Sequence, residues 1–423
     1  MLNPMRTFIL LLTITVSFPA LQSQEWTGFR GGDLHALAEG VGYPTEWNDS
    51  TNIVWKLPIE GKGWSSPIVK YGVVWVTTAI EKERDLILVG IDFEEGKIIH
   101  QIKLFRPDEF HNIHALNSYA TPTSCVDDKY VYVNFGRYGT ACVRISDLHV
   151  MWKREDLICD HFQGPGASPI LYKDKLILHF EGMDAQYIVA LDKNTGKTIW
   201  RIDRDEKIYS TLPEMERKAY VTPIVINVAD RDLLISNGSA GCFAYDVKNG
   251  EEVWRIVKGI TSTVSMPTYW NGNLYFFGGL VNKEDDKKHY HLTAADPKGK
   301  GDISKTNIIW VQDYSTSQML TPVVNKEVLY TMDTRGNMQG IDAFTGEIYW
   351  AKRFIGKFNS SPICAGGFVY FNSNRGETVV IKEGKELNIV SENLVEGQIW
   401  ATPAFVNGSI LLRISEYLYK VGL

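Results

Sequence analysis

Short apolar runs alternate with polar turns along nearly the whole chain, and no stretch shows the 3.6-residue period of an amphipathic helix. In the clearest unit, an apolar run leads into a turn at residues 192–196, and a second run at 198–202 carries Trp200 as a large anchor. Asn and Gly in that turn tolerate the positive φ angles that tight turns need. The same pattern returns at 245–254 and 341–350, which predicts antiparallel strand pairs joined by tight turns.

A second feature opens each copy of this pattern: Ser or Thr followed by Pro, directly before an apolar run. The hydroxyl residues of these pairs are Ser66, Thr121, Ser168, Thr222, Thr321, Ser361 and Thr402, and Met266-Pro267 is a degenerate eighth copy. Successive prolines lie about 40 to 55 residues apart, and each interval has room for four short strands. Such a period is typical of β-propellers, so we expect an all-β, eight-bladed propeller of four-stranded antiparallel blades.

The two ends of the repeat array complement each other. The eighth copy, residues 403–423, has only three strand-like runs, whereas an unpaired run with Trp55 lies at 52–56. Pairing this N-terminal strand with the last copy would close the ring as a three-plus-one blade and cover both exposed edges. We therefore expect residues 53–423 to form one closed propeller.

The N-terminal residues have a different character. Residues 1–23 are typical of a secretory signal peptide, because Arg6 precedes an apolar run at 8–16 that is too short to span a bilayer. No cysteine lies near the expected cleavage site at Ser23, so no lipid anchor is expected there, and no later run is apolar enough for a transmembrane segment. The sequence predicts a periplasmic or secreted protein in which residues 24–52 form an irregular lead-in packed on the ring.

Charge and cysteine content narrow the function classes. The formal net charge is −6, and lysine and arginine are spread along the chain without a basic stripe, which argues against nucleic acid as a partner. The five cysteines include no adjacent pair and no Cys-x-x-Cys motif, so we expect buried free thiols rather than a disulfide framework.

The motif Ala-x-Asp-x-x-Thr-Gly-Lys-x-x-Trp at 190–200 resembles the repeats of the pyrroloquinoline-quinone-like (PQQ-like) β-propeller family of exported bacterial proteins. Further features that resemble this family lie at 63–67, 117–122 and 159–166, and the resemblance covers essentially the whole mature chain. It implies the propeller fold, which carries many functions. Quinone-dependent dehydrogenases of this kind have adjacent cysteines over the cofactor and an acidic calcium site. Because neither can be matched here, we expect no PQQ cofactor.

Candidate chemistry gathers on the face that carries the loops before each Ser/Thr-Pro strand. The candidate ligand-binding residues there are His111, His114, Asn117, Tyr119, Arg137, Asp160, His161, Asp184, Gln186, Arg217 and Lys218. They belong to consecutive blades, so their loops are neighbours on the rim. The histidines could ligate a metal ion together with Asp160 or Asp184, or His161 could act as a general base oriented by a carboxylate. The same groups could instead only brace long loops.

A second, weaker candidate is a basic patch formed by Arg335, Arg375 and Arg413, which occupy comparable positions in the last three copies. Together these features favour a non-catalytic exported scaffold that binds a protein, peptide or glycan on the loop-rich face. The alternative is an enzyme acting on an extracellular carbohydrate, with its site at His111, His114, Asp160 and His161.

Overall fold

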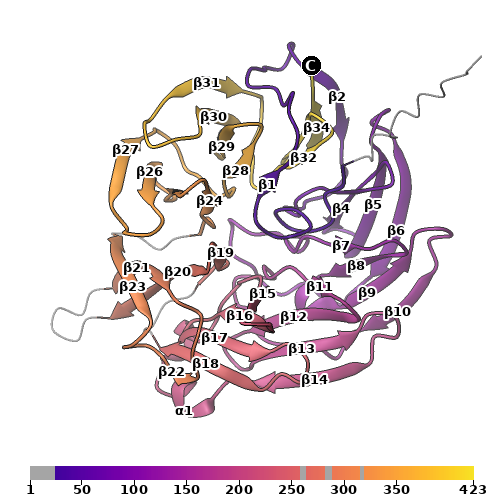
Figure 1. Ribbon diagram of the computed structural model, residues 1–423. Coiled ribbons are helices and arrows are strands. Elements are labelled where there is room, and N and C mark those ends of the chain that lie inside the picture. Colours follow the sequence, from indigo (N-terminus) through magenta and orange to yellow (C-terminus); the bar gives the residue numbers. More distant parts are fainter. Residues whose placement is uncertain (1–23, 258–262, 282–287, 315–318) are drawn as a thin grey trace, which may run out of the picture.

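The computed structural model describes residues 24–257, 263–281, 288–314 and 319–423, and the predicted signal peptide lies outside this part of the chain. The fold is an eight-bladed propeller, with eight antiparallel sheets arranged radially around a central channel (Figure 1). The all-β prediction is confirmed: the described helical elements are α1 (Glu206–Tyr209) and the two 3₁₀ turns η1 (Gly136–Tyr138) and η2 (Glu214–Glu216). None of the described helices is long and apolar enough to cross a membrane.

Each blade is numbered by the order of its innermost strand. Blade 1 contains β3 (Ile68–Lys70), β4 (Val73–Ile80), β5 (Asp85–Asp92) and β6 (Ile98–Phe105). Blade 2 contains β7 (Cys125–Val126), β8 (Tyr130–Asn134), β9 (Thr140–Arg144) and β10 (Val150–Arg154). Blade 3 contains β11 (Ile170–Tyr172), β12 (Lys175–Glu181), β13 (Gln186–Asp192) and β14 (Thr198–Asp203). Blades 4 and 5 contain β15 (Ile224–Val228), β16 (Arg231–Asn237), β17 (Gly241–Asp246) and β18 (Glu252–Val257), then β19 (Thr268–Trp270), β20 (Asn273–Val281), β21 (Lys288–Ala295) and β23 (Ile308–Tyr314). The short β22 (Gly301–Asp302) pairs in parallel with β18. Blades 6 and 7 contain β24 (Val323–Asn325), β25 (Val328–Met332), β26 (Asn337–Asp342) and β27 (Ile348–Arg353), then β28 (Ile363–Ala365), β29 (Phe368–Asn372), β30 (Glu377–Lys382) and β31 (Ile389–Leu394).

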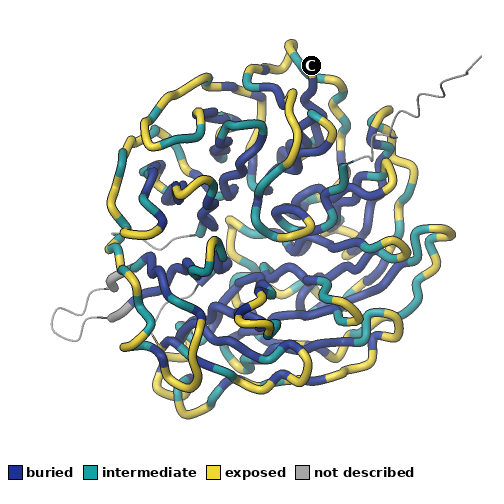
Figure 2. The backbone as a smooth tube through the Cα atoms, in the orientation of Figure 1, coloured by how far each residue is buried: buried dark blue, intermediate teal, exposed yellow. Residues whose placement is uncertain are grey.

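The last blade joins the two ends of the repeat array. It contains β32 (Ala404–Val406), β33 (Ser409–Ile414) and β34 (Tyr417–Val421), and the N-terminal strand β2 (Ile53–Pro58) pairs antiparallel with β34. The innermost strand of this blade, β32, contacts β3 of blade 1, so the blades form a complete circle. The inner strands are buried and the outermost strands alternate between exposed and half-buried positions (Figure 2), as expected for radial packing of sheets.

The tryptophans of the repeat connect neighbouring blades. Trp152, on the outermost strand of blade 2, lies against Gly196 in the turn of blade 3, where an added Cβ would lie 2.6 Å from the indole ring. The indole Nε1 of Trp152 donates a hydrogen bond to the carbonyl of Lys193 in the same turn, at 3.0 Å. Trp55, Trp200 and Trp310 make the equivalent bond to the next blade along the ring. The Asp-x-x-x-Gly turn and the Trp therefore form one interface between blades rather than two local features.

The N-terminal lead-in crosses the central channel at the far end of the inner strands. Trp26 bridges Val69 in the middle of β3, and the carbonyl of Thr27 accepts a hydrogen bond from Val126 N in blade 2, at 2.9 Å. Arg30 then reaches blade 6 on the other side of the channel. After this crossing, β1 (Leu37–Ala38) adds to blade 7 in parallel with β28. The lead-in thus contacts blades on opposite sides of the ring.

The cysteine prediction is confirmed: all five, Cys125, Cys142, Cys159, Cys242 and Cys364, are free and buried. They pack in the apolar interior of the blades as small hydrophobic residues do.

Candidate functional site

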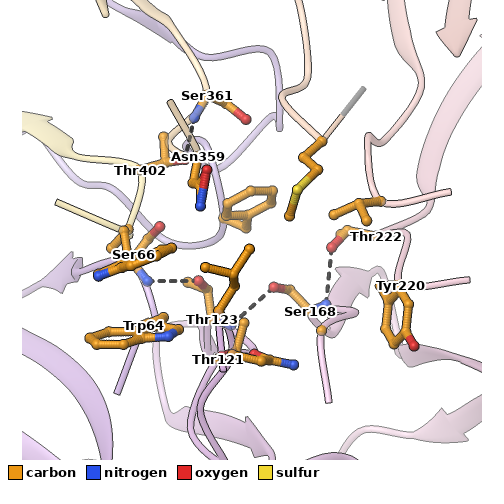
Figure 3. Close-up of a pocket in the computed structure, with 18 of the residues that line it drawn as sticks. Trp64, Ser66, Thr121, Thr123, Ser168, Tyr220, Thr222, Asn359, Ser361 and Thr402 are labelled. Atoms are coloured by element: carbon orange, nitrogen blue, oxygen red, sulfur yellow. Dashed lines mark hydrogen bonds between the residues drawn. The ribbon is translucent and has the colours of Figure 1, made fainter. Parts of the chain in front are cut away.

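A ring of hydroxyl groups surrounds the central channel where each blade begins. The backbone N–H of the residue two positions before an innermost strand donates to the side-chain hydroxyl at the same position in the next blade. Six such bonds, of 2.9 to 3.2 Å, link the blades. Figure 3 draws those of Ser66, Ser168 and Ser361 among them. We call the hydroxyl residues at these positions the hydroxyl ring: Ser66, Thr123, Ser168, Thr222, Thr321, Ser361 and Thr402.

The position in blade 2 differs from the sequence prediction. The Thr-Pro pair at Thr121 was expected to be equivalent to Ser66, but Thr123 occupies that place and accepts the bond from Ser66 N at 2.9 Å. The reason is the position of β7, which begins at Cys125, two residues after Thr123. Proline does not mark the repeat in this blade, because the residue after Thr123 is Ser124.

A second ring lies two residues earlier in each blade, because alternate residues of an extended backbone point to the same side. We call it the upper ring, and it consists of Trp64, Thr121, Gly166, Tyr220, Val264, Met319, Asn359 and Trp400. Both rings line a cavity of about 320 Å³. Trp64 and Trp400, from blades 1 and 8, stack with ring centroids 5.5 Å apart and planes 21° from parallel.

This cavity, the central well, is bounded on the side of the lead-in by Phe29. Trp26 pairs with Val69 within β3 and Thr27 with Val126, the last residue of β7, so Phe29 lies on the side of the channel away from the loops that precede these strands. The lead-in therefore converts an open channel into a well, whose mouth is on the loop-rich face. Its residues of mixed character, hydroxyl, amide, aliphatic and aromatic, are typical of a small-ligand site.

Charged side chains surround the central well without lining it. The described residues that line it include no Asp, Glu, Lys or Arg. Arg30 is fully buried, and its Nη1 and Nη2 donate to the carbonyls of Thr321 and Pro322 at 2.6 and 2.8 Å, while its Nε has no partner in the described part of the chain. Burial lowers the pKa of Arg30 to about 9.

Arg413 corrects the expected basic patch. Arg335 and Arg375 are exposed, but Arg413 is buried, and its Nη1 donates to the Ser65 hydroxyl at 2.6 Å. Burial lowers the pKa of Arg413 to about 9. Its position between blades 8 and 1 makes it a brace of the ring closure rather than a member of a surface patch. No described carboxylate lies within ion-pair distance of Arg413 or of Arg30.

Two of the candidate residues, His114 and Asn117, line the central well. Asn117 Nδ2 donates to the carbonyls of Gln163 and Pro165 at 2.8 and 3.0 Å, which joins the loop before blade 2 to the loop before blade 3. His114 is exposed at the mouth. These two residues therefore reach the rim of the cavity from the same loop, the one before blade 2.

His111 and Tyr119 lie further out in the same loop. The Tyr119 hydroxyl donates to the carbonyl of His111 at 2.8 Å, and His111 N donates to the hydroxyl of Tyr138 at 3.0 Å. Tyr119 also stacks on Phe110, with ring centroids 3.9 Å apart. These contacts hold the loop through its backbone and its aromatic rings.

His161 is a buried residue rather than an exposed one. Its side chain lies between the rings of Phe180 and Tyr220, and its Nε2 is 3.3 Å from Cys159 Sγ. Burial lowers the pKa of His161 to about 4, and burial also raises the pKa of Cys159 well above its usual value. At neutral pH the pair is thus a neutral imidazole beside a protonated thiol, which lacks the thiolate of a reactive cysteine.

The carboxylates near His161 cap loop backbone. Asp160 accepts a hydrogen bond from Phe162 N at 2.9 Å, and Asp184 accepts one from Asp160 N at 2.6 Å. In the described part of the chain, no group of three or more His, Cys, Asp or Glu residues is placed to hold a metal ion. The three histidines of the metal hypothesis are therefore not gathered into a site.

The remaining candidates also contact loop backbone. Gln186 Nε2 donates to the carbonyl of Gly182 at 2.7 Å, and Arg217 Nε donates to that of Leu212 at 3.1 Å. Lys218 is buried and its ammonium group donates to the carbonyl of Met215. Arg137 is half-buried in η1.

A buried ionic network beneath this loop region was missed from the sequence. Glu181, fully buried, accepts hydrogen bonds from His179 Nε2 at 2.7 Å, from Ser239 N at 2.9 Å and from the Tyr209 hydroxyl, and lies 3.3 Å from Arg204 Nη2. Burial opposes ionisation of Glu181, but the charge of Arg204 and the bond from His179 outweigh it and lower the pKa to about 2. The network fixes the segment that contains α1 onto blades 3 and 4.

Comparison with known proteins agrees with this architecture. Residues 184–304 and 301–390 match the sequence profile of the family described as outer membrane protein assembly factor BamB. The match identifies repeats of this PQQ-like β-propeller family in residues 184–390. The chain is 23% identical over 257 residues to tetrathionate hydrolase of Acidithiobacillus ferrooxidans, and 22% identical over 278 residues to BamB of Yersinia pestis. Both alignments cover 56% of this chain.

The similarity is partial in length. The alignment spans 47% of tetrathionate hydrolase and 69% of the Yersinia BamB. A third relative, methanol dehydrogenase subunit 1 of Methylobacterium organophilum, is 28% identical over 178 residues, which are 36% of this chain and 26% of the relative.

Solved structures of similar fold superpose over most of the chain. BamB from Moraxella catarrhalis gives a TM-score of 0.61 at 15% identity and covers 88% of this chain and 97% of its own. A europium-containing methanol dehydrogenase gives 0.65 at 10% identity, with 92% and 89% covered. At these identities the likeness establishes the fold and not the activity.

The quinone of the dehydrogenases was tested against the central well. A quinone that works with a metal ion needs acidic or amide ligands grouped around the ion. The described lining includes amides but no acidic side chain to balance the charge of such an ion, and the sequence has no adjacent cysteines. The residues present do not fit this cofactor.

Proposed function

We propose that the protein is a binding scaffold whose ligand enters the central well from the loop-rich face. The observation that supports this most directly is the pair of rings, in which hydroxyl groups and apolar side chains from all around the propeller line one cavity. The stacked Trp64 and Trp400 at its upper ring offer aromatic surface on a rigid frame, which is the kind of anchor that binding sites use.

The enzyme alternative has less support. His161 is buried and neutral, Asp160 and Asp184 accept hydrogen bonds from loop backbone, and in the described part of the chain no carboxylate bonds to the His161 ring. A general base needs access to the proton that it removes. A scaffold needs only the surface that is present, and one relative is named for a role in outer membrane protein assembly.

We further propose that the protein is exported. The apolar run at 8–16 behind Arg6 supports this, as does the name of the BamB relative. The ligand would then be a protein, peptide or glycan of the periplasm or the extracellular medium.

Binding is tested with a peptide library and a glycan array, followed by calorimetry of each hit. We expect a one-to-one complex whose affinity falls at least tenfold in the double variant Trp64→Ala/Trp400→Ala. The matched control is Tyr71→Ala, an exposed aromatic residue in the turn after β3, on the opposite face. Hits that bind the double variant as well as the wild type, or that lose affinity equally in Tyr71→Ala, would refute the proposal.

A further inference from the structure

The hydroxyl ring presents donors to the well. Six of its hydroxyl oxygens accept a backbone N–H from the neighbouring blade, so one lone pair of each is already used. Among the described residues, none accepts a hydrogen bond from these hydroxyl groups. Their hydrogens are therefore free for a ligand, and a ligand with several acceptor lone pairs suits them best.

Arg30 adds a positive charge next to this ring. Its guanidinium bonds to the carbonyl of Thr321, whose hydroxyl belongs to the ring, and to that of Pro322. The guanidinium is buried with one N–H unpaired and no described carboxylate within ion-pair distance. Asp33 acts on Arg30 only through space, without an ion pair, so the buried cation still raises the electrostatic potential around it, which favours an anion on the other side of Thr321.

Arg413 contributes a second charge of the same sign. It bonds to the carbonyl and hydroxyl of Ser65, which lies between Trp64 of the upper ring and Ser66 of the hydroxyl ring. Neither arginine has a described carboxylate partner, and the described lining of the well has no acidic group. Charge and hydrogen-bonding capacity therefore both select a ligand with an anionic oxygen group.

The rest of the well selects an apolar group beside that anion. Apolar side chains line the well near Thr321. Val264 and Met319 belong to the upper ring of blades 5 and 6, and Phe29 lies at the floor. For the hydroxyl groups of a sugar the described lining offers amide and hydroxyl oxygens as acceptors but no carboxylate. At about 320 Å³ the well is at the small end of ligand sites, so it holds one small group rather than a folded domain.

We propose that the central well binds the C-terminal end of a peptide, with the chain-terminal carboxylate at the hydroxyl ring near Thr321 and an apolar last side chain against Val264 and Met319. This inference rests on the proposed scaffold function and specifies its ligand. The carboxylate accepts hydrogen bonds from the ring hydroxyls. Its charge is balanced by Arg30, whose guanidinium donates to the backbone carbonyl of Thr321. The preceding residues of the peptide leave the well past Trp64 and Trp400.

The test uses three peptides in calorimetric titrations of the full protein: acetyl-Ala-Ala-Leu as the free acid, the same peptide as its C-terminal amide, and acetyl-Ala-Ala-Lys as the free acid. We expect the first to bind about tenfold or more tightly than either of the others, because hydrogen bonds to a charged group are worth more than neutral ones. Equal affinity of acid and amide would overturn the carboxylate assignment. It would leave the scaffold proposal intact if binding still depended on Trp64 and Trp400.

The variant Thr321→Val removes one ring hydroxyl and keeps the carbonyl that Arg30 binds. We expect it to weaken binding of the free acid about tenfold and to leave the amide unchanged. Thr268→Val is the matched control, because Thr268 is buried in blade 5 and donates to the carbonyl of Pro322, but does not line the well. If Thr321→Val does not fold, Ser361→Ala makes the same test in blade 7. An equal loss in Thr268→Val would overturn the proposal.

Two further titrations separate the sources of a carboxylate. Hexanoate carries the anion and an apolar group without a peptide, and an oligogalacturonate carries the anion on a sugar. We expect both to bind at least tenfold more weakly than acetyl-Ala-Ala-Leu. Binding of either one as tight as that of the peptide, with the same dependence on Thr321, would overturn the assignment to a peptide end.

Discussion

Trp55 lies directly over Gly96, at the one junction of the propeller where the N-terminal strand of the last blade meets the first blade. A Cβ at Gly96 would be 2.5 Å from the indole ring, and Trp55 Nε1 donates to the carbonyl of Phe93 at 3.0 Å. This is the same contact that Trp152 makes with Gly196 between blades 2 and 3. The ring closure is thus built from the repeat's own interface.

The first prediction concerns this contact. Gly96→Ala introduces a side chain at a φ of +63° and into the indole ring of Trp55, so we expect it to lower the free energy of unfolding by more than about 2 kcal/mol. Gly72→Ala is the control, since Gly72 has a φ of +72° but open space around its added Cβ. We expect about 1 kcal/mol for this variant in denaturant unfolding. Equal losses would mean that the indole moves aside at no cost.

A second prediction separates the two roles of tryptophan. Trp254 is fully buried, so Trp254→Ala should cost about 3–5 kcal/mol, as large-to-small core changes do. Trp400 is half-buried at the upper ring, and we expect Trp400→Ala to cost less than about 1 kcal/mol while it weakens ligand binding. Thermal or denaturant unfolding measures both. A large stability loss for Trp400→Ala would show that the Trp64–Trp400 stack supports the ring closure instead.

The third prediction is a pH dependence. Burial lowers the pKa of His161 from 6.5 to about 4, so the unfolded chain takes up a proton in this interval and the folded protein does not. The free energy of unfolding should therefore fall as the pH decreases from 6.5 to 4, by about 3 kcal/mol from this residue. His161→Phe should flatten the profile in that window, whereas His149→Phe, at an exposed position, should leave it unchanged. An unaltered slope in His161→Phe would contradict a buried neutral imidazole.

A fourth prediction compares the two kinds of buried arginine. Arg204→Met leaves Glu181 buried without its cation, so we expect a loss of about 3–5 kcal/mol in the free energy of unfolding. Arg30→Met removes a charge that has no described carboxylate partner, and should cost less than about 2 kcal/mol. For ligand binding we expect a large effect of the same variant: Arg30→Met should abolish the preference of the well for a peptide with a free carboxylate. Denaturant unfolding measures both losses in the free energy of unfolding. A loss in Arg30→Met as large as that in Arg204→Met would contradict this difference between the two arginines.

Local patterns were sufficient to predict the fold. The turn at 192–196, the anchor at Trp200 and the Ser/Thr-Pro period each depend on residues a few positions apart, and together they predicted an eight-bladed ring. The two rings of the central well also follow from the repeat spacing, because residues two positions apart in an extended segment point to the same side. Recognising them required the correct register in blade 2, where Thr123 and not Thr121 faces its neighbours.

The candidate site was less predictable because it depends on contacts between distant segments. Trp64 and Trp400 stand at opposite ends of the chain and meet only when the ring closes. The loops of His111 and His161 were correctly expected on neighbouring blades, but the burial of His161 depends on Phe180 and Tyr220, which no spacing rule connects to it. Phe29 enters the well because the lead-in crosses the channel, a path without a periodic pattern.

The path of the lead-in also sets the order in which the molecule can be assembled. Gln24 N bonds to Asn407 Oδ1, 383 positions away, and β2 has no partner until β34 exists. Strand β2 must therefore stay unpaired until almost all of the polypeptide has been made, and closing so long a loop is slow. A chain interrupted before its last blade would have no finished circle, and its bare strand edges would be open to aggregation and proteolysis.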